Sequence, residues 1–170
     1  MNICIISGYF NPIHPGHLSM IQDVKAKNPD CTLVVIVNND YQVGLKDSVP
    51  FLDEMTRCQI VQQIKGVDRV FLSIDKNRSV AKSLQYLIQD PAYQNYIIKF
   101  CNGGDRDPNS CENQEVRLCK KHNVEVEYRY GDNKTYSSSL IIKKAYVWMV
   151  KRRFWKNIAD EVLSKLNIKP

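Results

Sequence analysis

Two of the chain's three histidines stand three residues apart, around a Pro-Gly step near the N-terminus. The stretch reads "ISGYFNPIHPGHLSMI" over residues 6–21, with His14 and His17 in its middle. If a helix begins at this step, Pro15 suits its first turn and Gly16 lets a ligand approach the backbone closely. The helix then directs amide N–H groups at the ligand, which favours a phosphate. Two imidazoles there would hydrogen-bond the non-bridging oxygens of a phosphorus centre and stabilise charge that develops in a displacement reaction.

The same spacing has two other interpretations. Two histidines near a turn can be ordinary surface residues, since short motifs often match by chance. A zinc site would need a third and a fourth ligand, and the sequence offers no obvious candidates and no HExxH motif. The histidine pair by itself leaves these alternatives open.

Short apolar runs alternate with helical stretches along the rest of the chain. Strands are predicted over 2–7, 31–38, 68–74, 95–102 and 124–130. Helices are predicted over about 16–27, 53–66, 79–88 and 111–122, and from 137 nearly to the end. This alternation predicts an α/β fold, a Rossmann-like doubly wound parallel sheet of five strands with helices on both faces and a basic C-terminal helix.

In such a sheet the ligand site lies beyond the carboxyl ends of the strands. The loops to inspect are therefore 7–16, 38–52, 75–78, 102–111 and 130–138. The second of these holds Lys46, and Arg57 follows in the next helix. Each alone is more typical of a solvated surface charge than of a ligand.

The last two loops carry residues suited to a nucleotide. Gly103 and Gly104 free the backbone to approach a flat ligand such as a base, and Asp105 adds a polar contact, although Gly-Gly-Asp is also an ordinary turn. The three serines at 137–139 offer hydroxyl and amide groups to an anion, and one of them would suffice as a helix cap.

Several of these motifs together resemble one family. "GYFNPIHPGH" is similar to the G-x-F-D-x-x-H-x-G-H signature of the HxGH nucleotidylyltransferase (cytidylyltransferase-like) superfamily, which includes glycerol-3-phosphate cytidylyltransferase and the heptose-1-phosphate adenylyltransferases. "NNDYQVGLK", "MTRCQIVQQIKGVDRVF", "NGGDR" and "SSSLI" resemble its later motifs, in the family's order, so the resemblance covers roughly residues 1–145.

The resemblance implies transfer of CMP or AMP from a nucleoside triphosphate to a phosphorylated sugar or polyol, with Mg²⁺ and release of pyrophosphate. It implies that His14, His17 and Lys46 are catalytic and that Asn11 and Arg57 bind the acceptor. It further implies that a larger set binds the nucleotide, namely Gly8, Tyr9, Phe10, Gly16, Gly103, Gly104, Asp105, Ser137, Ser138 and Ser139.

Two departures from the family pattern leave an alternative open. Asn11 stands where many members have Asp, which removes a negative charge near the phosphates and the metal, and "SSSLI" lacks an arginine. The alternative is a non-catalytic nucleotide-binding or scaffold domain. The sequence decides neither between CTP and ATP nor which acceptor is used.

The net charge of +6 lies wholly in residues 143–170, which hold eight basic and two acidic residues, so residues 1–142 are neutral. We therefore predict a nucleotidylyltransferase domain over 1–142 and a basic amphipathic helical extension over 143–170, with no nucleic-acid partner. The apolar face of this extension, widened by two tryptophans, would pack on its own domain or on the mate in a homodimer. The alternative partner is an anionic membrane surface.

The six cysteines are scattered, without a CxxC pair, which argues against a disulfide framework. The N-terminus shows no signal-peptide pattern, and the apolar runs "LVVIV" and "YVWMV" are too short to span a bilayer. These features predict a reducing, cytoplasmic location.

Overall fold

The computed structural model describes residues 2–103, 113–131 and 136–165, with side chains as far as Ile158. Its strands are β1 (Asn2–Gly8), β2 (Cys31–Val37), β3 (Arg69–Leu72), β4 (Ile97–Gly103) and β5 (Glu125–Tyr130). Its helices are α1 (Pro15–Lys27), α2 (Asp40–Gly44), α3 (Glu54–Gln62), α4 (Ala81–Ile88), the 3-10 turn η1 (Pro91–Tyr93), α5 (Gln114–Lys121) and α6 (Ser138–Lys165). The five predicted strands are all present.

The five strands form one parallel sheet in the order β3-β2-β1-β4-β5. β1 lies at the centre, and the chain switches sides of it between β3 and β4. This arrangement confirms the predicted Rossmann-like α/β fold. It also brings the loops that follow β1 and β2 to the same end of the sheet, because the two strands are paired over their whole length.

The core consists of two layers, one on each face of the sheet. β1 alternates between them, with Cys4 and Ile6 on one face and Ile3 and Ile5 on the other. Residues of α1 and α3 complete the first layer, and residues of α4 and α5 complete the second. Because both faces are covered, the central strands read as continuous apolar runs rather than as alternating ones.

Two elements differ from the sequence prediction. The stretch predicted as a loop after β2 contains the short helix α2, which Asn39 caps by accepting a hydrogen bond from the Gln42 amide at 2.9 Å. Helix α3 begins after the predicted cap Asp53 but ends at Gln62 rather than near Gly66. After α3 the chain forms tight turns, in which an amide bonds to the carbonyl three residues earlier. Gly66, with φ at +98°, takes a backbone conformation there that suits glycine.

The chain divides into two compact units, Met1–Thr135 and Tyr136–Pro170. The second unit contains α6, which runs unbroken past the predicted boundary at 142. Among the described residues, no helix combines the length and the apolar composition needed to cross a membrane.

Candidate active site

The two histidines lie together at the start of α1. His14 precedes the helix with extended backbone angles, and His17 is the third helical residue, after Pro15 and Gly16. Their rings stack with centroids 3.8 Å apart and planes inclined by 29°. The predicted helix start is therefore confirmed, and both imidazoles lie beside the backbone amides of the first turn.

Burial holds His17 in its neutral form. Burial and, to a smaller extent, the neighbouring His14 together lower the pKa of His17 to about 3. The backbone N–H of His14 donates to Nδ1 of His17 at 3.3 Å. Because Nδ1 accepts this bond, the single ring proton of His17 lies on Nε2. Neutral His17 thus offers one N–H donor to a ligand.

His14 has a polar atom that its own chain does not satisfy. Nδ1 of His14 is buried, and in the described part of the chain it has no hydrogen-bond partner. Burial also lowers the pKa of His14. Since a buried polar atom without a partner costs free energy, a ligand oxygen or N–H group beside this nitrogen would be stabilised.

Phe10 supports His17 from the core. Its side chain is 4% exposed, and its ring centroid lies 4.6 Å from that of His17. The apolar core encloses the ring, and the expectation that Phe10 contributes to the nucleotide site stays a prediction. A Cβ on Gly8 would come within 3.0 Å of Phe10 Cε2, so Gly8 provides the room that this ring needs.

Lys46 approaches the same loop from the segment after α2. Its Nζ lies 4.1 Å from the centroid of the Tyr9 ring, in cation–π contact. The ammonium group is therefore held beside the residue that leads into Phe10 and the histidines. This places the predicted catalytic lysine next to the β1 loop.

Asn11 is engaged with the chain. Its Nδ2 donates to the carbonyl of Val49 at 2.9 Å, and its Oδ1 accepts from the amide of Phe51 at 2.8 Å. The side chain is 4% exposed. Asn11 thus joins the β1 loop to the segment between α2 and α3, and its role in acceptor binding stays a prediction.

Arg57 is likewise engaged with the chain. It is 1% exposed, and its guanidinium donates to the carbonyls of Leu52, Tyr9 and Asn38 at 3.1, 2.6 and 2.7 Å. A fourth bond, of 2.7 Å, joins it to the carboxylate of Asp40. The guanidinium is therefore engaged by these four partners, and the expectation that Arg57 binds the acceptor stays a prediction.

Asp40 and Glu54 were not identified from the sequence as residues of the site. The Asp40 amide donates to Oε2 of Glu54 at 2.8 Å, and the Glu54 amide donates to Oδ2 of Asp40 at 3.2 Å. Each carboxylate thus caps the helix that the other begins. Glu54 stands at a predicted helix start, whereas Asp40 lies in a stretch that was predicted as a loop, so no sequence signal linked the two residues.

The remaining predicted nucleotide contacts are only partly described. Gly103 ends β4 at the same end of the sheet, whereas Gly104 and Asp105 lie outside the described residues. Ser137 caps α6 by accepting from the Leu140 amide at 3.2 Å, and the first helical residues are Ser138 and Ser139. These serines belong to the second unit, so their predicted role stays a prediction.

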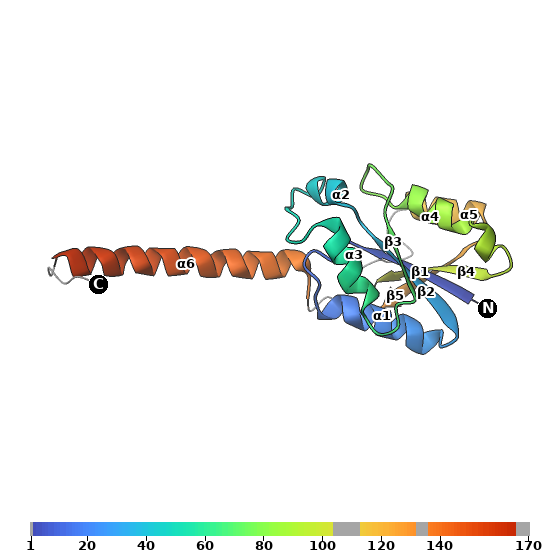
Figure 1. The fold of residues 1–170 in the computed structure, drawn as a ribbon, viewed down its shortest axis with the longest axis horizontal. Helices are drawn as coiled ribbons and strands as arrows, with labels where there is room; N and C mark the ends of the chain where they lie inside the picture. Colours follow the sequence, from blue (N-terminus) through green and yellow to red (C-terminus); the bar gives the residue numbers. More distant parts are fainter. Residues whose placement is uncertain (1, 104–112, 132–135, 166–170) are drawn as a thin grey trace. The chain divides into compact units, whose positions relative to one another are not determined.

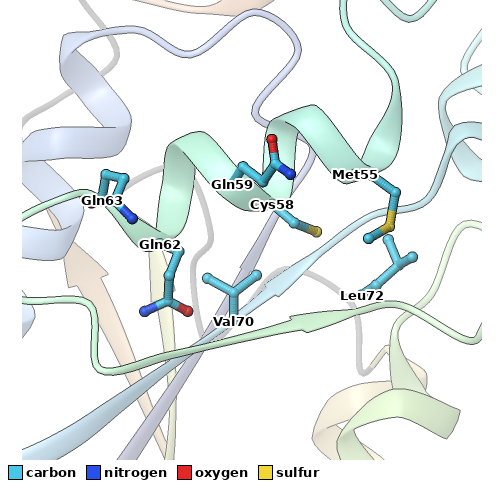
Figure 2. Close-up of a pocket in the computed structure, with 7 residues that line it drawn as sticks. All are labelled: Met55, Cys58, Gln59, Gln62, Gln63, Val70 and Leu72. Atoms are coloured by element: carbon cyan, nitrogen blue, oxygen red, sulfur yellow. The ribbon is translucent and has the colours of Figure 1, made fainter.

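A groove of about 560 Å³ lies elsewhere, between α3 and the edge strand β3 (Figure 2). Val70 and Leu72 line it from β3, and from α3 and its C-terminal end it is lined by Met55, Cys58, Gln59, Gln62 and Gln63. It contains none of the residues predicted to act in catalysis. In the described part of the chain, no three His, Cys, Asp or Glu residues form a group that could hold a metal ion.

The chain is similar in sequence to known proteins. The family model for cytidylyltransferase-like proteins matches residues 5–164. The FAD synthase of Korarchaeum cryptofilum is 33% identical over 146 residues, which are 82% of this chain and 88% of that protein. The FAD synthase of Methanosphaera stadtmanae is 36% identical over 72 residues, 42% of this chain, and the match spans about half of that protein, 49%.

Two solved structures share the fold. The lipopolysaccharide core biosynthesis protein of Thermoplasma volcanium GSS1 gives a TM-score of 0.59 at 22% identity, over 78% of this chain and 99% of that one. A bifunctional NMN adenylyltransferase/ADP ribose pyrophosphatase from Francisella tularensis gives 0.56 at 15% identity, over 81% of this chain and 40% of that one. At these identities the likeness concerns the fold alone.

Proposed function

Because the chain belongs to the cytidylyltransferase-like family of nucleotidyltransferases, we propose that it transfers AMP from ATP to the phosphate of FMN, forming FAD and pyrophosphate. The stacked pair His14 and His17 at the start of α1 is the observation that carries the proposal. The choice of ATP and FMN is supported by the relatives that are named FAD synthase.

The reaction is a displacement at the α-phosphorus of ATP. A phosphate oxygen of FMN forms a bond to that phosphorus, the bond to the oxygen bridging to the β-phosphate breaks, and pyrophosphate leaves. Negative charge builds up on the non-bridging oxygens of the α-phosphate. Donors that are already in place stabilise this charge without reorganisation, which is where most of the catalytic effect arises.

The described residues supply such donors. Nε2–H of neutral His17 would donate to a non-bridging oxygen, and its fixed tautomer keeps the proton on the side away from His14's amide. Lys46, held over the Tyr9 ring, would offset the negative charge of the α-phosphate of ATP and of the FMN phosphate that attacks it. Mg²⁺ stays an implication of the family resemblance, carried in by the triphosphate, and we assign no step to it because the described residues do not form a site for it.

This proposal narrows the prediction made from sequence in one respect and changes it in another. Nucleotidyl transfer is confirmed as the family's chemistry. The acceptor differs from the one expected from the sequence, because relatives named FAD synthase support FMN rather than a phosphorylated sugar or small polyol. The sequence left CMP and AMP open as the transferred group, and the proposal chooses AMP.

The test is pyrophosphate release with ATP and FMN, beside parallel reactions with CTP and with glycerol 3-phosphate. We expect release only with ATP and FMN together. His17→Ala should lower kcat by about 10²–10³-fold, the usual cost of one transition-state donor, with the melting temperature kept. His122→Ala, which removes the histidine outside the site, is the control. Binding of ATP without any turnover would favour the scaffold alternative, and turnover with CTP would overturn the choice of nucleotide.

A further inference from the structure

The side chain of Asn11 holds the segment between α2 and α3 in place, through one bond that it donates and one that it accepts. Asn11 donates to the Val49 carbonyl and accepts from the Phe51 amide, at 2.9 and 2.8 Å. A carboxylate at this position could accept the second bond but could not donate the first. The neutral residue that departs from the family pattern therefore has a specific structural use, which is to fix residues 49–51 against the β1 loop.

The clamped segment presents apolar side chains to solvent. Val49 is 73% exposed, Phe51 is 56% exposed and Leu52 is 43% exposed. Arg57 fixes the segment from its other end by donating to the Leu52 carbonyl. A segment whose backbone is tied at three positions while its apolar side chains stay exposed is suited to receive a ligand, because little ordering entropy is lost on binding.

This segment joins α2 to α3 (Figure 1), and Lys46 and Phe51 stand five positions apart within it. Five residues of chain span at most about 17 Å, so a ligand with a charged end and a flat end can reach both. Lys46 is the group that would meet a phosphate, since its ammonium lies over Tyr9 beside the histidine loop. The flat end of the same ligand would then lie toward Val49 and Phe51.

We propose that Val49 and Phe51, held by Asn11, form the surface on which the acceptor's aromatic ring rests. The inference rests on the proposed function, in which the acceptor is FMN. It assigns a binding surface to the flavin ring, which the catalytic residues would not contact. Stacking on an exposed aromatic side chain stabilises a planar ligand without reading its hydrogen-bonding groups. Phe51 would therefore select flat acceptors against small polyol phosphates.

The experiment measures FMN binding by the fluorescence anisotropy of the flavin, and then steady-state kinetics. In Phe51→Ser the dissociation constant and the KM for FMN should rise about tenfold, while the KM for ATP, the kcat at saturating FMN and the melting temperature stay unchanged. Phe51→Tyr keeps the ring and should restore the affinity. Ile97→Ser removes an equally exposed apolar side chain, 62% exposed at the start of β4, and should change nothing.

Asn11→Asp tests the clamp. Because this variant loses the N–H donor to the Val49 carbonyl, its KM for FMN should rise, as in Phe51→Ser, while the KM for ATP stays unchanged. If Phe51→Ser turns over FMN with the KM of the unaltered chain, the proposed surface is wrong and the proposed function stands. If the unaltered chain neither binds nor adenylylates FMN, the function and the surface fall together.

Discussion

The hydrogen bond from the His14 amide to Nδ1 of His17 decides which proton the site can offer. It requires a neutral imidazole with its proton on Nε2, and burial, which lowers the pKa of His17 to about 3, supplies that neutral form. A cationic imidazole would attract phosphate more strongly in the ground state. A neutral donor in a fixed position binds the ground state less strongly and still gains interaction energy as charge develops, and this difference between ground state and transition state accelerates a reaction.

Gly8 gives a prediction about the support of His17. A methyl group in Gly8→Ala would come within 3.0 Å of the Phe10 ring, and this ring lies against His17. We expect a loss of stability of about 1–2 kcal/mol from the overpacked ring. We also expect a fall in kcat, because the displaced ring would shift the imidazole.

Gly44→Ala is the matched control, since a Cβ there meets nothing within 4 Å. Urea denaturation and pyrophosphate release on both variants measure the two effects. If Gly8→Ala had the same stability and the same kcat as Gly44→Ala, Phe10 would not position His17.

At the scale of elements, Arg57 joins four parts of the chain. It bonds to carbonyls in the β1 loop, at the end of β2 and just before α3, and to Asp40 at the start of α2. Loops usually vary in position because their backbone groups face water. Here one buried guanidinium satisfies carbonyls from successive loops, so the strand ends and helix starts hold a fixed arrangement.

We predict that Arg57→Met destabilises the fold by about 3 kcal/mol, because it leaves three carbonyls and a carboxylate without their donor. Arg57→Lys should recover only part of this loss, since an ammonium group lacks the planar fork that reaches several acceptors. Lys65→Met, at an exposed position after α3, controls for the loss of a positive charge. Urea denaturation would contradict the prediction if Arg57→Met and Lys65→Met unfolded at the same concentration.

The sequence was enough to predict the sheet and the helix that carries the histidines. The apolar runs of the central strands and the Pro-Gly step are local signals, so they can be read without knowing the fold. The environment of Arg57 could not be read in this way, because its burial depends on carbonyls up to 48 residues away. Asn11 looked like a lost carboxylate for the same reason: its partners, Val49 and Phe51, lie 38 and 40 residues further along the chain.

At the scale of the whole molecule, charge and apolar exposure are concentrated in α6. From Ser138 to Ile158 this helix has six basic residues and no acidic residue. Its aromatic side chains Tyr146, Trp148, Phe154 and Trp155 are 58–66% exposed. This positive charge is complementary to an anionic surface, the partner that the sequence left open beside packing on the helix's own domain or on a homodimer mate.

We therefore predict that the intact protein binds vesicles containing anionic lipid and not vesicles of neutral lipid. Each lysine or arginine near such a surface contributes about 1 kcal/mol, and tryptophan and tyrosine side chains favour the headgroup region. Binding should weaken as salt is raised, because the surface potential is screened. Flotation on a density gradient measures it, with the combined variant Lys151→Gln, Arg152→Gln and Arg153→Gln as the control. Protein that stays in the bottom fraction with anionic vesicles, or a variant that floats as well as the unaltered chain, would show that the charge of α6 serves another purpose.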